Sequence, residues 1–488
     1  MKKYLSIVVA ALMALSMMAA CRSNSGDASP TTAPTADTPA AADPTTAPAA
    51  TDSTEAPADT PVEDTGTEIL SANDMGGYHM VVKSSWAHQW VFVEGRDILE
   101  YNELFVDQML RVEEELNCTI EFIASNDWDT QIEIVITSIN SGDKYADFAD
   151  LSSGHFLSLA MQGMLRDLFT LNAYTPGDPR WDSTTTRASN INGKQFGTFA
   201  ANQEKVIIYV NNTFLNSLGL EPLDAVIARD DWNWDTFRMY CLTATQDLDG
   251  DGAMDTYGVL VSHWSELAST LLFTNGSRII DQDGDGRFYF AANTPNAFRA
   301  LDFMGQLMFE DGVHAKDADG QYNLGNDYFA QGTTLFLPAR DYVAGYFAGW
   351  GVDFEYQAVP LPKGPDYNEW ITWNSGLRTF CMPVNIPDED AEKAMTILNA
   401  MFEPIPGHTI ADTYINMRND YYSEDMSIEY MKMLDDVNHI NYIQYIGLGP
   451  YGSMIFELRE GANTAAAAVA SHEDAMQDFI DVMLNLTD

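Results

Sequence analysis

Four aspartates and one backbone carbonyl have the spacing of the oxygen ligands in a calcium-binding loop, at positions 1, 3, 5, 7 and 9. In order, they are Asp247, Asp249, Asp251, Ala253 and Asp255. Gly252 stands at the turn position, but Gly258 stands at position 12, where an EF-hand has a bidentate glutamate. The segment therefore predicts a structural Ca²⁺ site of weak affinity, with a dissociation constant of about 10⁻⁴ to 10⁻³ M. An acidic turn without metal is the alternative.

A second acidic segment, Asp281 to Gly286, matches only the beginning of the same pattern. Tyr289 stands at position 9 and Ala292 at position 12, and neither side chain is a calcium ligand. The segment lies between two apolar runs and contains Asp-Gly pairs, which favour a tight turn between antiparallel strands. We therefore expect a β-hairpin here.

Several aromatic and charged residues stand where strand patterns end or loops begin. Flat aromatic faces stack on the C–H faces of sugar rings, while Asn, Asp and Arg side chains bind hydroxyl groups. Each tryptophan could instead pack in a core, and Trp234, which lies on a helical apolar face, is assigned to the core. The candidate contacts for a small solute are Trp86, Asp127, Trp128, Trp264, Arg340, Tyr342 and Trp373.

Sequence motifs of common cofactor and hydrolase sites are missing or misplaced. The eight histidines include no pair three to five residues apart, so there is no H-E-x-x-H zinc motif. Residues 447–452 match G-x-G-x-x-G, but Pro450 interrupts the turn and too few residues follow for a dinucleotide fold. No Walker loop or G-x-S-x-G sequence occurs. With 72 acidic and 25 basic residues and a formal net charge of −47, the chain is expected to bind no nucleic acid.

Strand and helix patterns alternate along the first part of the folded region. A strand pattern at residues 78–83 precedes a helical pattern at 104–116 and a second strand pattern at 119–123. A helix at 132–139 and a third strand at 146–151 continue the alternation. Such βαβ units predict an α/β fold with a largely parallel sheet, whose ligands bind beyond the carboxyl ends of the strands.

A second mixed region follows, and the folded part is long enough for two domains. Cys118, Cys241 and Cys381 are an odd number of cysteines set among apolar neighbours, so we expect buried free thiols.

The two N-terminal segments have the composition of a targeting signal and a tether. Residues 1–20 place two lysines before an apolar run that ends in small residues, which is typical of a secretory signal peptide. Met18 to Cys21 resembles the lipobox of bacterial lipoproteins, so cleavage before Cys21 and lipidation of its thiol are expected; an ordinary secreted protein is the alternative. Residues 21–68, rich in Ala, Thr and Pro, cannot bury a core and predict a disordered linker.

The order of features in residues 69–488 resembles the type 1 extracellular solute-binding proteins, the maltose-binding-protein-like lipoproteins that feed ABC importers. The resemblance is carried by VEEELNCTIEFI, GMLRDL, WNWDTF, AVPLPKGPD and the run from Phe380 into PDEDAEKAMTIL. It implies a two-lobed, type II periplasmic-binding-protein fold whose hinge is crossed several times by the chain. By resemblance, we place crossings near 208–212, 334–338 and 373–379.

The crossings divide the folded part as follows: 69–208 first lobe, 209–334 second lobe, 335–375 return to the first lobe, and 376–488 second-lobe return with C-terminal helices.

The same resemblance implies a non-enzymatic receptor that captures a sugar or oligosaccharide between the lobes and delivers it to ABC permease subunits in the membrane. We expect a monomer, anchored through Cys21 at the extracellular face of the cell membrane. The family often has a tryptophan where this chain has Arg340-Asp341-Tyr342, which allows a charged or more polar solute. An exported glycoside hydrolase or lyase is one alternative, and a receptor for peptide, polyol or uronate is another.

Overall fold

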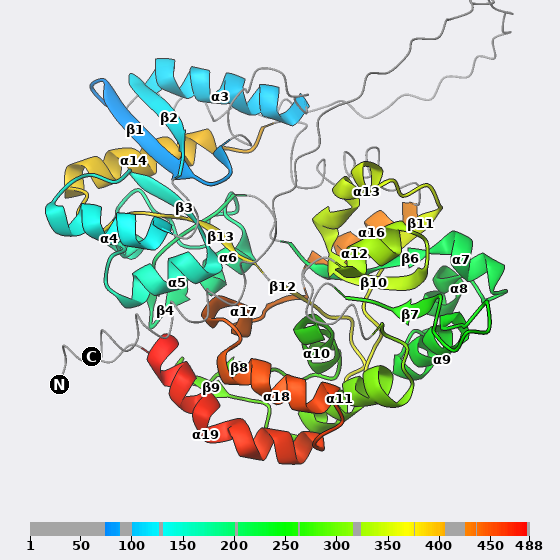
Figure 1. Ribbon diagram of the computed structural model, residues 1–488. Helices are drawn as coiled ribbons and strands as arrows, with labels where there is room; N and C mark the ends of the chain where they lie inside the picture. Colours follow the sequence, from blue (N-terminus) through cyan, green and yellow to red (C-terminus); the bar gives the residue numbers. More distant parts are fainter. Residues whose placement is uncertain are drawn as a thin grey trace, which may run out of the picture. The chain divides into compact units, whose positions relative to one another are not determined.

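The computed structural model describes residues 74–87, 100–125, 130–200, 204–261, 264–315, 324–374, 376–405, 425–435 and 437–485. All of them belong to one compact unit, Asp64–Asp488. The predicted signal peptide, Cys21 and the predicted linker lie outside the described residues. Two four-stranded sheets, each flanked by helices, form the framework of this unit (Figure 1).

The first sheet has the strand order β13-β3-β1-β2. Strand β1 pairs in parallel with both β2 and β3, and β13 joins β3 in the antiparallel sense. The parallel part follows from the βαβ pattern in the sequence, since α3 connects β1 to β2 and α4 connects β2 to β3. Their bounds are β1 Tyr78–Ser84, α3 Glu100–Leu116, β2 Cys118–Ala124, α4 Gln131–Ser141, β3 Phe148–Ser152 and β13 Arg378–Cys381.

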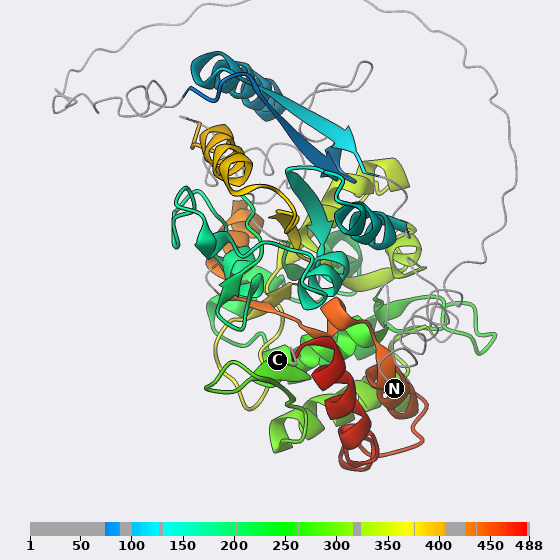
Figure 2. The same cartoon turned by 90° about the vertical axis from the view of Figure 1, so that its left-hand side faces the viewer.

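Helix α14, Asp388–Met401, supplies much of the core of this sheet although it is distant in sequence. Its buried face includes Ala394, Leu398 and Met401, spaced for one side of a helix, and it packs against α3 and β1. In both Figure 1 and Figure 2, α14 (gold) lies beside these elements.

The second sheet has the strand order β11-β6-β10-β7. Strand β6 is buried along its whole length, which matches its continuous apolar sequence and its central position. Strand β10 pairs antiparallel with β6 and parallel with β7. The bounds are β6 Val206–Asn211, β7 Tyr257–Val259, β10 Thr334–Arg340 and β11 Tyr356–Val359.

The remaining elements surround these sheets or form short hairpins. In the C-terminal part, α18 and α19 pack against each other and against α11 (orange, red and green in Figure 1). The bounds before β10 are α5 Ser153–Met161, η3 Leu168–Thr170, α6 Ser183–Ala188, β4 Asn190–Ile191, β5 Lys194–Gln195, α7 Asn212–Ser217, α8 Leu223–Ala228, α9 Trp234–Ala244, α10 Trp264–Thr274, β8 Ile280–Gln282, β9 Phe288–Phe290, α11 Pro295–Gly305, η4 Gln306–Glu310 and α12 Leu324–Ala330. After β10 they are η5 Asp341–Val343, α13 Ala344–Trp350, β12 Thr372–Asn374, α16 Asp425–Asp435, β14 Asn438–Ile440, α17 Ile443–Ile446, α18 Gly449–Arg459 and α19 Ala465–Met483.

The strand pairing corrects two of the lobe boundaries. We predicted a crossing at 334–338 and a return of 335–375 to the first lobe, but β10 and β11 both pair with β6 in the second sheet. We also assigned 376–488 as a whole to the second lobe, whereas β13 and α14 belong to the first sheet and its core. The error has a physical cause: an apolar strand has the same sequence pattern whether it crosses between two sheets or lies in the middle of one sheet.

Two other expectations, the buried cysteines and the hairpin, are confirmed. The three cysteines of the described part are buried free thiols, and burial raises the pKa of each. The segment 281–286 covers the end of β8 and the turn of the antiparallel β8–β9 hairpin. Within the described residues, no helix is both long and apolar enough to cross a membrane.

Candidate functional site

At the end of β1 and β3, an arginine, a buried carboxylate and two aromatic rings come together. Asp150 on β3 has no exposed side-chain surface; it forms an ion pair with Arg378, and Ser84 Oγ donates to it at 2.6 Å. The guanidinium of Arg378 lies 4.1 Å from the ring centroid of Trp86 and 5.0 Å from that of Phe199. Trp86 thus presents one face to a cation, a favourable arrangement for an aromatic ring.

The second sheet carries a similar arrangement at the carboxyl end of β10. Arg340 Nε lies 3.3 Å from Glu204 Oε1, and Arg340 Nη2 lies 3.2 Å from Glu266 Oε1. Glu204 lies two residues before the start of β6, and Glu266 lies in the first turn of α10, where a helix favours negative charge. One arginine therefore connects three elements at this edge of the sheet.

A buried lysine, Lys205, follows Glu204 in the chain and pairs with two aspartates. Lys205 is 2% exposed, and its Nζ lies 2.7 Å from Asp435 Oδ1 and 3.6 Å from Asp341 Oδ2. Burial raises the pKa of Asp341, while the positive charge of Lys205 opposes that rise. These contacts fix the backbone at the junction between Glu204 and Arg340.

The two arrangements meet where the chain returns to the first sheet. A Cβ atom placed on Gly376 would lie 2.9 Å from Glu204 Oε1, so the Glu204 side chain lies against the segment that leads into Arg378. We call the combined group the strand-end cluster; its residues are Trp86, Asp150, Glu204, Glu266, Arg340 and Arg378.

Three exposed aromatic residues continue from the strand-end cluster along η5 and α13. Tyr342, Tyr346 and Trp350 are 47%, 54% and 37% exposed. The rings of Tyr342 and Tyr346 have centroids 6.2 Å apart, and those of Tyr346 and Trp350 are stacked at 5.7 Å. The spacing of four residues places them on one face of the segment, and we call this set the aromatic ladder.

The predicted solute contacts have different outcomes. Trp86 and Arg340 lie in the strand-end cluster, and Tyr342 begins the aromatic ladder. Trp373 has no exposed surface; its ring stacks on Phe273 and its Nε1 donates to Thr270 Oγ1 at 3.3 Å, so we withdraw it as a ligand contact. Trp264 is the first residue of α10, and its side chain is outside the described part, as are Asp127 and Trp128.

Asp150, Glu204, Glu266 and Arg378 were not predicted from the sequence. A signal existed for Asp150, because a carboxylate inside the apolar run Phe148–Leu151 requires a buried partner. The partner could not be identified, since Arg378 lies more than two hundred residues away in sequence.

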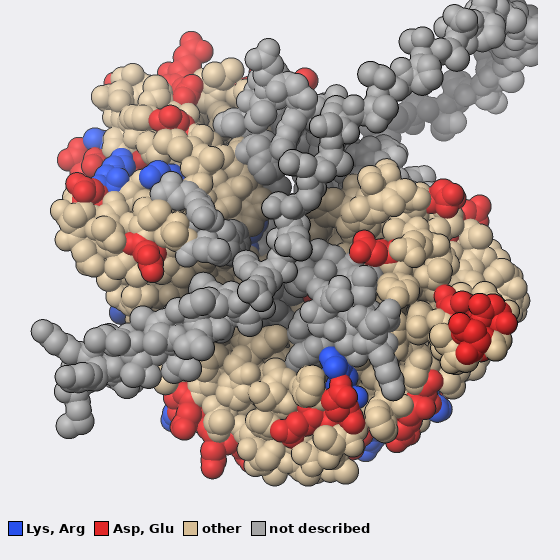
Figure 3. All heavy atoms as spheres, in the orientation of Figure 1, with Lys and Arg blue, Asp and Glu red and all other residues tan. Residues whose placement is uncertain are grey.

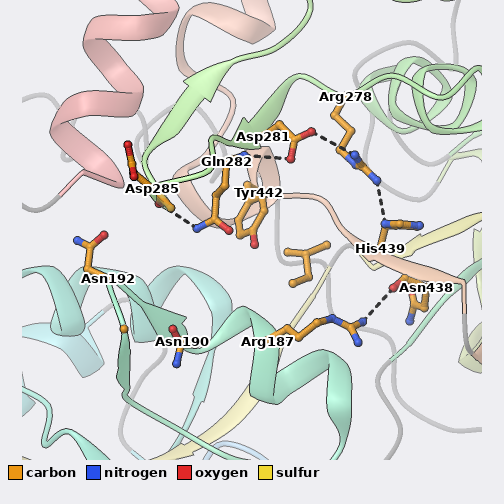
Figure 4. A pocket seen from close by; sticks show the side chains of 13 residues that line it. Arg187, Asn190, Asn192, Arg278, Asp281, Gln282, Asp285, Asn438, His439 and Tyr442 are labelled. Atoms are coloured by element: carbon orange, nitrogen blue, oxygen red, sulfur yellow. Dashed lines mark hydrogen bonds and ion pairs between the residues drawn. The ribbon is translucent and has the colours of Figure 1, made fainter.

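A polar cavity of about 530 Å³ lies between three segments of the chain (Figure 4). One wall is the end of α6 with the β4–β5 turn, another is the β8–β9 hairpin, and the third is β14 with Tyr442. No residue of the strand-end cluster lines this cavity. Its lining is polar and carries both charges: the arginines Arg187 and Arg278, the carboxylates Asp281 and Asp285, and the polar residues Asn192, Gln282, Asn438 and His439.

The acidic loop between α9 and β7 has part of the geometry that is expected of a cation site. Ligand oxygens of Asp247, Asp249 and Asp255 lie within 4.8 Å of one another, and all three residues are exposed. The turn residues Gly250 and Gly252 have φ angles of 84° and 92°, which the tight loop requires. The three carboxylates fit a hard cation such as calcium.

The structure explains why position 12 of this loop is not glutamate. A Cβ atom on Gly258 would lie 2.3 Å from the Cα of Cys241 in α9, so no side chain fits there. Asp251 accepts from the backbone of Ala253 at 2.7 Å and does not belong to the group of three. The donor set is therefore smaller than in a complete EF-hand loop.

Two α/β sheets with charged and aromatic residues at their strand ends are typical of binding proteins that hold solutes outside the carboxyl ends of strands. Residues 100–405 match the family model described as bacterial extracellular solute-binding protein. The chain belongs to this family. No curated protein sequence is significantly similar to the chain.

Solved structures share the fold at low sequence identity. The cyclic alpha-maltosyl-1,6-maltose binding protein from Arthrobacter globiformis has a TM-score of 0.59 and 17% identity, over 84% of this chain and 100% of that chain. An ABC substrate-binding protein from Listeria monocytogenes in complex with cycloalternan has a TM-score of 0.56 and 16% identity, over 82% of this chain and 98% of that chain. UgpB from Mycobacterium tuberculosis in complex with glycerophosphocholine has a TM-score of 0.56 and 14% identity, over 83% of this chain and 99% of that chain. The chain thus has the type II, two-lobed fold predicted from its sequence.

Proposed function

We propose that this protein is the solute-binding component of an ABC importer and that it captures a sugar or oligosaccharide at the strand-end cluster. One observation carries the proposal: each sheet ends in an arginine–carboxylate pair, with the rings of Trp86 and Phe199 against Arg378 and with Tyr342, the first ring of the aromatic ladder, two residues after Arg340 in the chain. The chain's family and the sugar ligands of two of its structural neighbours support it.

The chemistry of the strand-end cluster suits hydroxyl-rich solutes. Guanidinium groups donate to ring and hydroxyl oxygens, and carboxylates accept from hydroxyl groups. Aromatic faces cover the C–H faces of sugars, and a ligand held by such groups on both sheets stabilises the closed arrangement of the lobes. The aromatic ladder favours an oligosaccharide, because it extends this surface away from Arg340.

A binding role agrees better with the carboxylates than hydrolysis does. Asp150, Glu204 and Glu266 are each held in an ion pair with an arginine. A glycoside hydrolase needs one carboxylic acid that carries a proton. We therefore propose that the ligand is released unchanged.

The location belongs to the same proposal. The protein is exported, lipidated at Cys21 and held outside the cell membrane by residues 21–68, so that the ligand-bound form can reach permease subunits in the membrane. The excess of carboxylates over basic side chains on the face in Figure 3 fits a surface in contact with solvent. Calcium in the acidic loop would be part of the scaffold.

Isothermal titration calorimetry of the mature protein, with Cys21→Ser to prevent lipidation, tests the proposal. Mono- and oligosaccharides are screened first, and the ligand is recovered and checked for intact length. We expect Arg340→Gln to weaken binding at least tenfold, about 1.4 kcal/mol. Arg287→Gln is the matched control, because Arg287 is exposed and its partner Asp481 lies on α19. Release of new reducing ends, or equal binding by both variants, would refute the proposal.

A further inference from the structure

The polar cavity between α6, the β8–β9 hairpin and β14 is a second candidate for ligand binding. Its volume of about 530 Å³ is in the range of small-molecule sites. Figure 4 shows Arg187 on one side of it and Arg278 with His439 on the other. The cavity shares no residue with the strand-end cluster, so an inference about it is independent of the proposed function.

Two arginines, Arg187 and Arg278, line the cavity, and Arg187 has the weaker hydrogen bonds. Its Nη2 donates to Thr184 Oγ1 at 3.5 Å and to the carbonyl of Asn438 at 3.4 Å, both long distances. Among the described residues, no carboxylate oxygen lies within 4.0 Å of it, although the chain has 72 acidic residues and only 25 basic ones. An arginine in this setting is well suited to an anionic ligand.

The opposite wall is held rigid by hydrogen bonds. Arg278 Nη1 lies 3.2 Å from Asp281 Oδ2, and its Nη2 lies 2.9 Å from Nδ1 of His439. Burial and the nearby guanidinium groups of Arg278 and Arg187 lower the pKa of His439 to about 4. The imidazole is therefore neutral at pH 7, its Nδ1 accepts from Arg278, and its Nε2 carries the proton as a donor.

Asn438 supplies a further observation. It is 5% exposed, lines the cavity, and its Nδ2 donates to the carbonyl of Glu204 at 3.1 Å. Its Oδ1 is buried and has no hydrogen-bond donor among the described residues. Since this oxygen has no accessible surface, a ligand in the cavity does not reach it, and the side chain serves to tie β14 to the segment before β6.

The β4–β5 turn and the β8–β9 hairpin add neutral polar groups. Asn192 and Gly193 form the tight turn with φ angles of 51° and 74°, which places Asn192 at the cavity next to Asn190. Gln282 lies on β8, where its Nε2 donates to the carbonyl of Gly286 at 3.3 Å. Amides both donate and accept, as a ligand with several hydroxyl groups requires.

We propose that this cavity binds a small hydroxylated carboxylate, an aldonate or uronate of monosaccharide size. Its carboxylate pairs with Arg187, and its hydroxyl groups bond to the amides of Asn190, Asn192 and Gln282. A neutral sugar of the same size lacks the partner for Arg187, and inorganic phosphate lacks the hydroxyl groups.

Isothermal titration calorimetry of the mature Cys21→Ser protein with gluconate, glucuronate, glucose and phosphate tests the inference. We expect gluconate or glucuronate to bind at least tenfold more tightly than glucose and phosphate. Arg187→Gln should weaken that binding at least tenfold. Lys194→Gln should leave it unchanged, because Lys194 is an exposed cation on β5 that does not line the cavity. The unfolding midpoint of Arg187→Gln, an exposed residue, serves as the check that it folds.

Three results would overturn the inference. One is no heat of binding for either acid at millimolar concentration, and another is equal binding by the wild type and Arg187→Gln. The third is loss of acid binding in Arg340→Gln but not in Arg187→Gln, which would place the acid at the strand-end cluster. Conversely, acid binding that survives in Arg340→Gln while sugar binding is lost separates the two sites.

Discussion

Arg378 and Asp150 form an ion pair in which the carboxylate has no exposed surface and the guanidinium is 21% exposed. The pair joins β13 to β3, two neighbouring strands that are more than two hundred residues apart in sequence. A buried carboxylate is tolerated only with such compensation, and Ser84 supplies a further hydrogen bond.

Arg378→Gln should therefore destabilise the protein by about 3 kcal/mol, because it leaves the charge of Asp150 buried without a cation. Urea unfolding measures the effect. The control is Lys393→Gln, which breaks a surface pair with Glu389 and should leave the urea midpoint almost unchanged. The double variant Asp150→Asn/Arg378→Gln should recover part of the loss. Equal stability of wild type and Arg378→Gln would contradict this account of the pair.

Gly258→Ala should destabilise the protein by about 3 kcal/mol, since the new methyl group would overlap the backbone of α9. Its Cβ would lie 2.3 Å from Cys241 Cα and 2.4 Å from the Cys241 carbonyl oxygen, and backbone atoms cannot rotate away. Gly284→Ala, in the β8–β9 turn, meets no atom within 4 Å and should be neutral. The comparison is made by urea unfolding; variants that unfold at the same urea concentration would show that β7 does not pack closely on α9.

The parts of the fold that follow from local sequence pattern could be predicted. The alternation of periods 2 and 3.6 gave β1, α3, β2, α4 and β3, and the chain order of these elements gave their parallel pairing. The pattern could not show which sheet a later strand joins. Strand β10 is apolar on both faces, and only its hydrogen bonds to β6 and β7 place it in the second sheet.

The only residues of the candidate site that could be predicted from the sequence are those that stand at a strand end. Trp86 and Arg340 follow recognisable strands, which is why they were found. Trp373 stands at the start of a predicted crossing, but the structure places it within β12, whose three residues are buried, and the indole packs against Phe273. Glu204 and Arg378 depend on contacts across the chain, which spacing does not encode.

Calcium should stabilise the protein through the acidic loop. At ten times a millimolar dissociation constant, the expected gain is about 1.4 kcal/mol, visible as a rise in the thermal midpoint. Asp249→Ala should abolish the rise, because Asp249 is one of the three clustered carboxylates. Asp283→Ala in the β8–β9 turn should retain it. An equal rise with MgCl₂, or in Asp249→Ala, would show that the stabilisation does not come from calcium in this loop.

His439 should make stability depend on pH in a defined window. Its pKa is about 4 in the folded protein and 6.5 in the absence of such surroundings. Between these values the unfolded chain binds a proton that the folded protein does not, so stability is lost as the pH falls from about 6.5 to 4. His439→Gln removes this contribution and can still accept from Arg278. Urea unfolding of both proteins at pH 7 and pH 4.5 should show the larger loss in wild type, whereas parallel losses would mean that His439 is not held neutral.

Tyr346 should contribute to the binding of long but not short oligosaccharides. Its ring is 54% exposed at the centre of the aromatic ladder, between Tyr342 and Trp350, so only a ligand that extends beyond Arg340 reaches it. If the strand-end cluster binds a sugar, Tyr346→Ala should weaken a bound hexasaccharide roughly tenfold, about 1.4 kcal/mol, and leave a disaccharide unchanged. Tyr289→Ala, an exposed tyrosine on β9, is the matched control. Equal weakening at both lengths would show that the ring supports the site as a whole, and no weakening at either length would remove the aromatic ladder from the binding surface.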